Sequence, residues 1–366
     1  MKALIFISFI LFPTRILGIE LGIGSVHKIG SMAWQNLRHA IDEWNNANAI
    51  SAGFSLDLIT TSDSSATIDE RFCDVIQRKV VALIVDDVEE IESLFLLYSM
   101  CERFRVPCVL TNGKLLPHDH EFVTNIGLSR GVIGRAASEF VKRLRWNTFL
   151  LIYQFPEDLD DIADLLSVWH DEQGRSVVLK VLQLPADSSL YDAFLKYVRE
   201  KLKQTNIVVH TRDFGIIHTL LAHATLLNMT ESRYSYFFTN PDLALLEDFF
   251  QDLNRIYRCN ITGIQLVQHD PLMKTDLALT IDTVNIIGEA LRIQNERGGK
   301  IPEANGLLCD ANDVWRDGDM FSKKIREVEL ADAMTGEVVF SPNGQRTNTT
   351  LLAITRTNGK FSKVGH

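Results

Sequence analysis

Two short polar segments carry the residue types that could bind a metal ion or transfer protons. His118-Asp-His120 offers imidazole and carboxylate groups, but it follows Pro117 in a polar loop with no third or fourth ligand beside it. Four carboxylates, from Asp158 to Asp164, surround the start of an expected helix, where the helix dipole favours negative charge. We therefore predict a solvated turn and a helix start, and no metal site.

The recurring motifs of catalysis and phosphate binding are missing from the sequence. It has no Gly-x-Ser-x-Gly elbow, no Gly-rich phosphate loop ending in Lys-Ser/Thr, and no His-Glu-x-x-His pair. Gly22-x-Gly24 starts like a dinucleotide-binding turn, but His27 stands where the third glycine would fall. We predict that the chain is not an enzyme and has neither a catalytic residue nor a cofactor.

The elements around these residues alternate between strand and helix, which predicts a parallel α/β fold. The segment 80–85 is apolar on both faces, as a buried parallel strand is. A helix from Ile91 to Arg105 and a strand from Val106 to Leu110 complete a strand–helix–strand unit. The other elements expected before it are strands 19–24 and 54–59 and helices 31–48 and 68–78.

The alternation restarts near residues 127–134, which predicts a second lobe of the same architecture. The elements expected there are strands 148–153, 177–184, 207–210 and 234–238, and helices 133–144, 157–173, 190–202 and 214–227. After helices 276–295 and 320–330, segments 335–340 and 350–355 are expected to close the fold as an antiparallel hairpin. The predicted fold class is two lobes, each a doubly wound, mainly parallel sheet flanked by helices.

The helix from Ile91 to Arg105 has more apolar surface than one sheet can cover, because a surface helix normally shows a single apolar stripe. Two neighbouring stripes cover much of this helix: Ile91, Leu94, Phe95 and Tyr98 in one, and Leu97, Met100 and Phe104 in the other. Either a partner protein or another element of the same chain must pack against it.

The N-terminus has the three parts of a secretory signal peptide. Lys2 precedes an apolar run from Ala3 to Phe12, and Gly18 is a small residue at the expected cleavage point. We expect residues 1–18 to be removed and the mature chain, 19–366, to enter the secretory pathway. No later apolar stretch reaches the ~20 residues that span a bilayer. The net charge of −10 disfavours binding to nucleic acid or to anionic membranes.

Export would allow the cysteines to form disulfides and three sequons to be glycosylated. In an oxidising compartment the five cysteines can form disulfides, and the odd count leaves one unpaired or bonded to another chain. Cys101 and Cys108 are separated by about one helix-to-strand turn. They could equally be two buried thiols that form no bond. The sequons at Asn228, Asn260 and Asn348 predict surface positions that carry glycans.

Several stretches follow one another along the chain: Arg143-Leu-Arg-Trp-Asn-Thr148, Leu182-Gln-Leu-Pro-Ala-Asp187, Tyr236-Phe-Phe-Thr239 with Asp242-Leu243, Asn260-Ile-Thr-Gly263, Trp315-Arg316, Leu330 through Thr335-Gly336 to Phe340, and Lys363-Val-Gly365. In the order and spacing of these stretches the chain resembles the amino-terminal domain of kainate-type ionotropic glutamate receptors. The resemblance implies a periplasmic-binding-protein-like fold of type I with multiple interlobe crossings. It also implies a first lobe of about residues 19–128 and 269–330 and a second of about 129–268 and 331–366.

The resemblance implies a disulfide between Cys73 and Cys309, because the family bonds a cysteine before the third strand to one shortly before the Trp-Arg pair. Such a bridge would stabilise the fold by roughly 4–5 kcal/mol in the chain-entropy model. Two free thiols are the alternative. Cys101 matches a family position that is commonly a buried cysteine. Cys259 has no counterpart, so we expect it to be the odd thiol or an intermolecular bond.

The resemblance also implies dimerisation through first-lobe helices, which would cover Ile91, Leu94, Phe95 and Tyr98. In amino-acid-binding relatives the turn after the third strand is rich in Gly and Ser. Here the segment 86–90 is Asp-Asp-Val-Glu-Glu, whose carboxylates repel a ligand carboxylate and offer it no hydrogen-bond donor. We therefore expect no binding of glutamate between the lobes.

These expectations describe an extracellular, non-enzymatic assembly module of a kainate-like receptor subunit. It would form homo- or heterodimers with glutamate receptor subunits and contact extracellular synaptic proteins. Because the sequence holds no channel segment, we expect a fragment, an isoform or a secreted protein, at the plasma membrane and synapse when part of a full receptor. The alternative is a soluble bilobed protein that binds a small ligand between its lobes.

Overall fold

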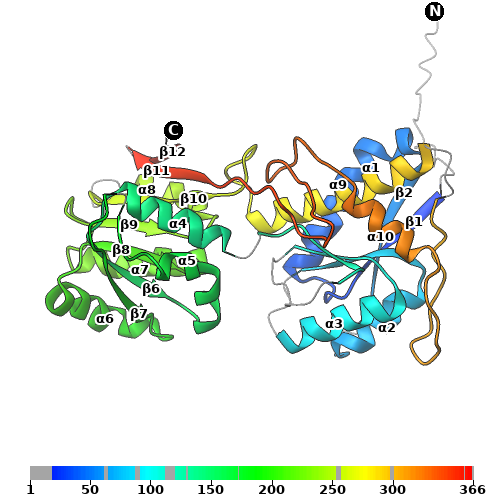
Figure 1. Cartoon of the computed structure of the whole chain (residues 1–366), viewed down its shortest axis with the longest axis horizontal. Helices are drawn as coiled ribbons and strands as arrows, with labels where there is room; N and C mark the ends of the chain where they lie inside the picture. Colours follow the sequence, from blue (N-terminus) through cyan, green and yellow to red (C-terminus); the bar gives the residue numbers. More distant parts are fainter. Residues whose placement is uncertain are drawn as a thin grey trace, which may run out of the picture.

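The computed structural model describes residues 19–61, 65–86, 91–111, 120–128, 131–171, 173–252, 257–296, 301–357 and 359–364. In Figure 1 they form two lobes, each built around a β-sheet with helices packed against it. The predicted fold class, two α/β lobes with mainly parallel sheets, is confirmed.

The first lobe contains a five-stranded, parallel sheet in the order β2-β1-β3-β4-β5. Its strands are β1 (Ile19–Ser25), β2 (Phe54–Thr60), β3 (Val80–Val85), β4 (Cys108–Leu110) and β5 (Val123–Asn125). Every residue of β3 is buried, as in a central strand covered on both faces. The sequence did not predict β5, because three residues with one large apolar side chain give too little pattern.

Helices cover both faces of the first sheet (Figure 1). They are α1 (Met32–Ala52), α9 (Thr275–Glu296) and α10 (Gly318–Arg326) on one side, and α2 (Ile68–Gln77) and α3 (Ile91–Phe104) on the other. The Ser31 side chain caps α1 by accepting a hydrogen bond from the Trp34 N–H. α1 and α9 pack closely because Gly288 leaves room for the Trp44 indole, which a Cβ at this position would overlap.

The second lobe contains a seven-stranded sheet in the order β12-β11-β10-β9-β8-β6-β7. Five strands are parallel: β6 (Thr148–Tyr153), β7 (Val178–Gln183), β8 (Asn206–His210), β9 (Ser235–Phe238) and β10 (Asn260–Gln265). The last two, β11 (Leu352–Thr357) and β12 (Lys360–Lys363), extend the sheet in antiparallel pairing.

The two faces of the second sheet each carry their own hydrophobic core. One face packs against α4 (Val132–Arg143), the 3-10 helix η1 (Pro156–Ile162) and α5 (Ala163–Leu166). The other packs against α6 (Tyr191–Tyr197), the π-helical η3 (Val198–Leu202), α7 (Phe214–Leu226), η4 (Leu243–Leu246) and α8 (Glu247–Asp252), and the short η2 (Ser188–Leu190) leads into α6.

The chain crosses between the lobes after β5, after β10 and before β11. The last crossing falls later than the predicted boundary at residue 331. Ala333, Val338 and Phe340 are buried in the first core, and the Arg346 N–H donates to the Asn125 carbonyl oxygen. The predicted hairpin of 335–340 with 350–355 is therefore wrong, because the first segment stays in lobe 1 while β11 pairs with β10 and β12.

The predicted helix 157–173 is also wrong in type and length. This stretch forms η1 and the four-residue α5, and a bridge between His170 and Ser176 then turns the chain into β7. His210 Nε2 lies 3.1 Å from the Asp158 carbonyl oxygen. In an α-helix this oxygen would accept a hydrogen bond from the backbone N–H four residues later. Contacts with the sheet thus replace the regular helix.

Candidate functional site

Helix α3 is held against the first sheet by its buried face. Leu94 and Tyr98 are 1% and 0% exposed, and Leu97 and Phe104 are buried with them. Two of the four predicted interface residues, Leu94 and Tyr98, are therefore covered by the same chain and are not free to meet a partner. The side chain of Ile91 lies outside the described residues.

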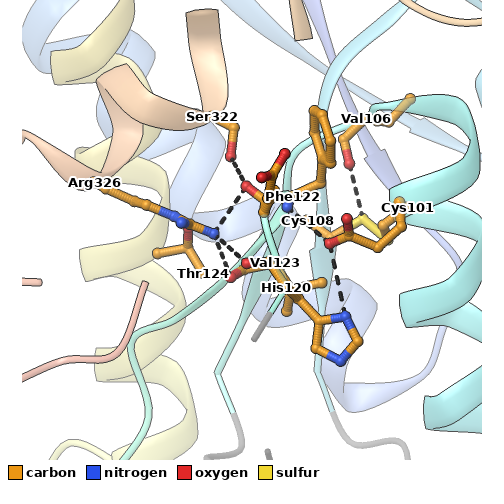
Figure 2. Close-up of polar contacts among 11 residues, drawn as sticks. Cys101, Val106, Cys108, His120, Phe122, Val123, Thr124, Ser322 and Arg326 are labelled. Atoms are coloured by element: carbon orange, nitrogen blue, oxygen red, sulfur yellow. Dashed lines mark hydrogen bonds and ion pairs between the residues drawn. A yellow bond between two sulfur atoms is a disulfide. The ribbon is translucent and has the colours of Figure 1, made fainter. Parts of the chain in front are cut away.

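The C-terminal half of α3 is tied to strands β4 and β5. A disulfide joins Cys101 to Cys108, at a Cα–Cα distance of 6.2 Å, where the sequence left two buried thiols equally possible. The Glu102 carboxylate accepts a hydrogen bond from the Phe122 N–H at 2.9 Å, and His120 Nδ1 lies 3.7 Å from the same carboxylate. Figure 2 shows these contacts side by side, and together they fix the rotation of α3 about its axis.

Arg326, at the end of α10, holds the segment that leads into β5 (Figure 2). Its Nη2 donates to the carbonyl oxygens of residues 120, 121 and 123, and its Nη1 donates to that of Pro342. Ser322 donates to the Glu121 carbonyl oxygen at 2.7 Å. Because a guanidinium has five N–H donors, one side chain can satisfy several carbonyls that no sheet partner reaches.

The opposite face of α3 is exposed and partly apolar. Phe95 is 56% and Leu96 39% exposed, whereas most large apolar side chains of this lobe are in its core. The exposed positions follow helical spacing and form what we call the α3 stripe: Glu92, Phe95, Leu96, Ser99 and Arg103. The stripe has an acidic end, an apolar centre and a basic end.

A second polar region lies at the carboxyl ends of β1, β3 and β4. Ser25 Oγ lies 2.7 Å from His27 Nδ1, and His27 Nε2 lies 2.5 Å from the Asp86 carbonyl oxygen. Thr111 donates to the Asp86 carboxylate at 2.6 Å. All four side chains are buried, so the hydroxyl groups of Ser25 and Thr111 are already engaged within the chain. Of the predicted acidic turn, only Asp86 lies within the described residues.

The carboxyl ends of the second sheet carry a comparable buried network. His210 lies between Thr239 Oγ1, 2.8 Å from Nδ1, and the Asp158 carbonyl oxygen, 3.1 Å from Nε2. Burial lowers the pKa of His210 to about 4, so the ring is neutral at pH 7. Arg212 Nη2 lies 2.5 Å from the buried Asp158 carboxylate. Asp158, predicted to serve a helix start, is thus paired with a cation from the β8–α7 connection.

The remaining predicted positions fall into three groups. Cys73 and Cys309 form a disulfide with a Cα–Cα distance of 5.7 Å. The alternative, that both are free thiols, is therefore wrong. Asn228, Asn260 and Asn348 are exposed at the surface. Cys259 is a free, buried thiol whose pKa burial raises to about 12, so an intermolecular disulfide is not accessible to it in the folded chain.

The described residues contain no group of three or more His, Cys, Asp or Glu side chains placed to hold a metal ion. Of the segment His118-Asp-His120, only His120 lies within the described residues. Its ring packs edge-on against the Tyr98 ring, with 5.3 Å between the ring centroids. Among the helices described, none is long and apolar enough to cross a membrane.

Comparison with known families agrees with this architecture. Residues 35–357 match the family described as receptor family ligand binding region. The chain belongs to this family. Its two lobes and their crossings are therefore those of a receptor family ligand binding region, a class of receptor domain rather than of enzyme.

Within this family the chain is similar to kainate-type glutamate receptors. It is 24% identical over 335 residues to mouse (Mus musculus) glutamate receptor ionotropic, kainate 4, covering 83% of the chain and 33% of the relative. It is 25% identical over 237 residues to Caenorhabditis elegans glutamate receptor ionotropic, kainate glr-3, covering 61% and 27%. The chain thus spans about a third or less of these relatives. The predicted resemblance to a kainate-type amino-terminal domain is confirmed.

Proposed function

We propose that this chain is an extracellular assembly module that pairs with a second receptor subunit through the α3 stripe. The single observation that carries the proposal is the exposure of Phe95, at 56%, on a helix whose other aromatic side chains, Tyr98 and Phe104, are buried. An exposed aromatic side chain beside a second apolar one is the usual centre of a protein interface.

The charges of the α3 stripe suit a two-fold pairing with an equivalent helix. Glu92 and Arg103 are eleven positions apart, which separates them by about 16 Å along the helix. When two such helices pack antiparallel, each acidic end meets the partner's basic end, and Phe95 and Leu96 meet near the axis. The hydrogen bond of Glu102 with the Phe122 N–H and the Cys101–Cys108 disulfide support this proposal, because they hold the stripe outward.

The polar side chains at the carboxyl ends of the first sheet disfavour binding of glutamate. A ligand carboxylate needs hydrogen-bond donors, but Ser25 and Thr111 are buried and direct their hydroxyl groups to His27 and Asp86. The Asp86 carboxylate adds negative charge at the same place. We expect calorimetry with L-glutamate to give no heat of binding, and a micromolar affinity would favour the alternative of a small-ligand-binding protein.

Sedimentation velocity of the secreted chain tests the assembly proposal. We expect a dimer at tens of micromolar and a monomer after Phe95→Glu, because a buried charge at the interface centre is costly. The matched control is Ile50→Glu, which places the same charge on an exposed isoleucine of α1. A monomeric wild-type chain, or a dimer that survives Phe95→Glu, would show that the α3 stripe is not the interface.

The same module would act in homo- or heterodimers of glutamate receptor subunits and present its free surfaces to extracellular synaptic proteins. The named relatives are subunits of the kainate type, which supports this class of partner. Mixing the chain with the corresponding region of a kainate 4 subunit, with the Phe95→Glu variant as control, distinguishes a heterodimer from a homodimer.

A further inference from the structure

The second lobe presents a group of exposed cations at one edge of its sheet. Helix ends and strand starts meet at the same edge of a parallel α/β lobe. Arg143 is the last residue of α4, and Arg145 follows it before β6. Lys201 lies in the last turn of η3, and Lys203 caps η3 before β8. We call these four residues the basic edge.

Direct contacts bring the two halves of the basic edge together. Gln204, next to Lys203, donates from Nε2 to Thr148 Oγ1 at 2.9 Å, and Asn206 Nδ2 donates to the Thr148 carbonyl oxygen at 3.0 Å. β6 lies between β8 and β7 in the sheet. The cations therefore lie at two neighbouring strand starts, β8 and β6, which are about 5 Å apart.

The four cations are exposed, and none of them forms a direct ion pair within the described part of the chain. The comparable edge of the first lobe differs, because Arg78 pairs with Asp74 at 2.8 Å and Arg105 with Asp319 at 3.0 Å. Glu200, which adjoins Lys201, offsets only part of the charge of the basic edge. The cationic edge stands out on a chain whose net charge is −10.

The backbone supplies an independent observation. Arg145 and Lys203 have positive φ angles of 54° and 50°, the left-handed conformation that glycine usually adopts after a helix. A side chain there costs about 1–2 kcal/mol relative to glycine, and a cation at a helix C-terminus returns only about 0.3–1 kcal/mol. Folding energetics therefore do not favour a cation over glycine at either position. Lys79 and Arg105 of the first lobe share this conformation, so it accompanies the exposed charges of the basic edge without being special to them.

We propose that the basic edge binds a sulfated glycosaminoglycan, a linear polyanion of the extracellular space. The proposal rests on the proposed extracellular location but not on the α3 stripe, which lies in the other lobe. A cluster of four exposed cations suits a polymer with a high density of sulfate groups, and release of its counterions drives binding.

Two of the predicted glycosylation sites lie on the β9–β10 side of the same edge. Asn260 begins β10, and Asn228 follows α7 beside it, because the Cys259 N–H donates to the Thr230 carbonyl oxygen at 2.9 Å. These sequons therefore sit at the β9–β10 half of the edge, whereas the cations sit at the β8–β6 half. Asn228 is also near η3, because Arg199 of η3 donates to the carbonyl oxygen of the preceding residue, Leu227, at 2.9 Å.

Binding of the secreted, glycosylated chain to an immobilised heparin oligosaccharide tests the proposal. We expect saturable binding that weakens as salt rises and falls at least about tenfold for Arg145→Gln/Lys203→Gln. The matched control, Lys28→Gln/Lys79→Gln, removes the same charge from exposed lysines of the first lobe and is expected to bind like the wild type. Equal loss in both variants, or equal binding of desulfated heparin, would overturn the proposal.

Three further measurements separate heparin binding from folding, from binding of acidic protein segments and from dimerisation. Lys203→Gly is expected to unfold at the same or a higher temperature and yet to bind heparin more weakly. If Lys203→Gly unfolds at a lower temperature than the wild type and binds heparin as tightly, the Lys203 cation stabilises the fold and the proposal is wrong. A poly-glutamate peptide that binds as tightly as the heparin oligosaccharide would show that the basic edge recognises acidic protein segments instead. Sedimentation of Arg145→Gln/Lys203→Gln should show the wild-type dimer.

Discussion

Asp242 follows β9 in the second lobe, yet its carboxylate caps a helix of the first lobe at Thr275. Asp242 Oδ1 accepts hydrogen bonds from the Thr275 N–H at 2.8 Å and from the Thr275 hydroxyl at 2.6 Å. Thr275 is the first residue of α9, where orphan N–H groups and the helix dipole favour a negative side chain. The contact ties the two lobes together at the crossing that follows β10.

Replacing Asp242 should therefore loosen the junction of the lobes. We expect Asp242→Ala to lower the free energy of unfolding by about 1–2 kcal/mol, as for the loss of an N-cap. Urea unfolding measures the change, and hydrogen exchange should rise at the start of α9. The control is Asp276→Asn, which removes an exposed carboxylate from the same helix turn. Equal stability of Asp242→Ala and the wild type would show that the cap does not hold the lobes.

Arg346 should be irreplaceable by lysine. Its buried guanidinium donates to the Thr335 hydroxyl at 2.8 Å and to the carbonyl oxygens of Thr335 and Glu337 at 2.9 Å. The Asp282 carboxylate accepts from the same Thr335 hydroxyl at 2.6 Å. A lysine has the charge but not the fork of donors, so Arg346→Lys should cost about 2–3 kcal/mol in the free energy of unfolding.

Chemical denaturation of Arg346→Lys measures this cost, and Arg316→Lys is the control on an exposed arginine. Faster hydrogen exchange is expected in residues 333–340, which Arg346 holds in the first lobe. The account of this segment fails if both variants unfold at the same denaturant concentration.

His210 should make the fold sensitive to acid. Burial lowers its pKa to about 4 in the folded chain, from 6.5. Between these values the unfolded chain binds a proton that the folded chain does not, so the stabilisation is complete above pH 6.5 and is lost as pH falls toward 4. The largest loss is about 3 kcal/mol. Urea unfolding from pH 7 to pH 4 should show a slope that His210→Gln reduces, and an unchanged slope would contradict the burial of a neutral ring.

The disulfide between Cys73 and Cys309 should contribute a large part of the stability of the first lobe. It joins residues 236 apart in sequence, and in the chain-entropy model so long a loop corresponds to about 5 kcal/mol. Cys73→Ser/Cys309→Ser is expected to unfold at a much lower urea concentration, while Cys309→Ser alone tests for an effect of the remaining thiol. A double variant as stable as the wild type would show that the bridge restrains little in the unfolded chain.

The strands buried on both faces could be predicted closely, because they are continuous apolar runs. The expected strand 148–153 coincides with β6, and the expected strand 80–85 with β3. Strand β10 escaped prediction because its sequence, NITGIQ, mixes polar residues with a glycine. Gly263 is needed there because a Cβ would meet the Leu243 side chain and the Phe238 carbonyl oxygen. Tertiary packing, not local pattern, selects this strand.

The candidate site could be predicted only in part. The excess of apolar residues on α3 was evident, but its apolar stripes wrap so far around the helix that the sequence could not tell which side faces the sheet. The fold places Leu94 and Tyr98 inward and Phe95 outward. The contact of His27 with Asp86 joins residues 59 apart, and the basic edge joins α4 to η3, so both depend on the topology of the sheets.

A cysteine placed on the α3 stripe tests the central claim most directly. Ser99 is exposed beside Phe95 and Leu96, so in a two-fold pairing of α3 helices Ser99→Cys should lie near the axis and form a disulfide with its copy. The account predicts a covalent dimer on a non-reducing gel for Ser99→Cys and none for Ser51→Cys, an exposed position on α1. A monomer for Ser99→Cys under oxidising conditions, at a concentration where the chain sediments as a dimer, would contradict it.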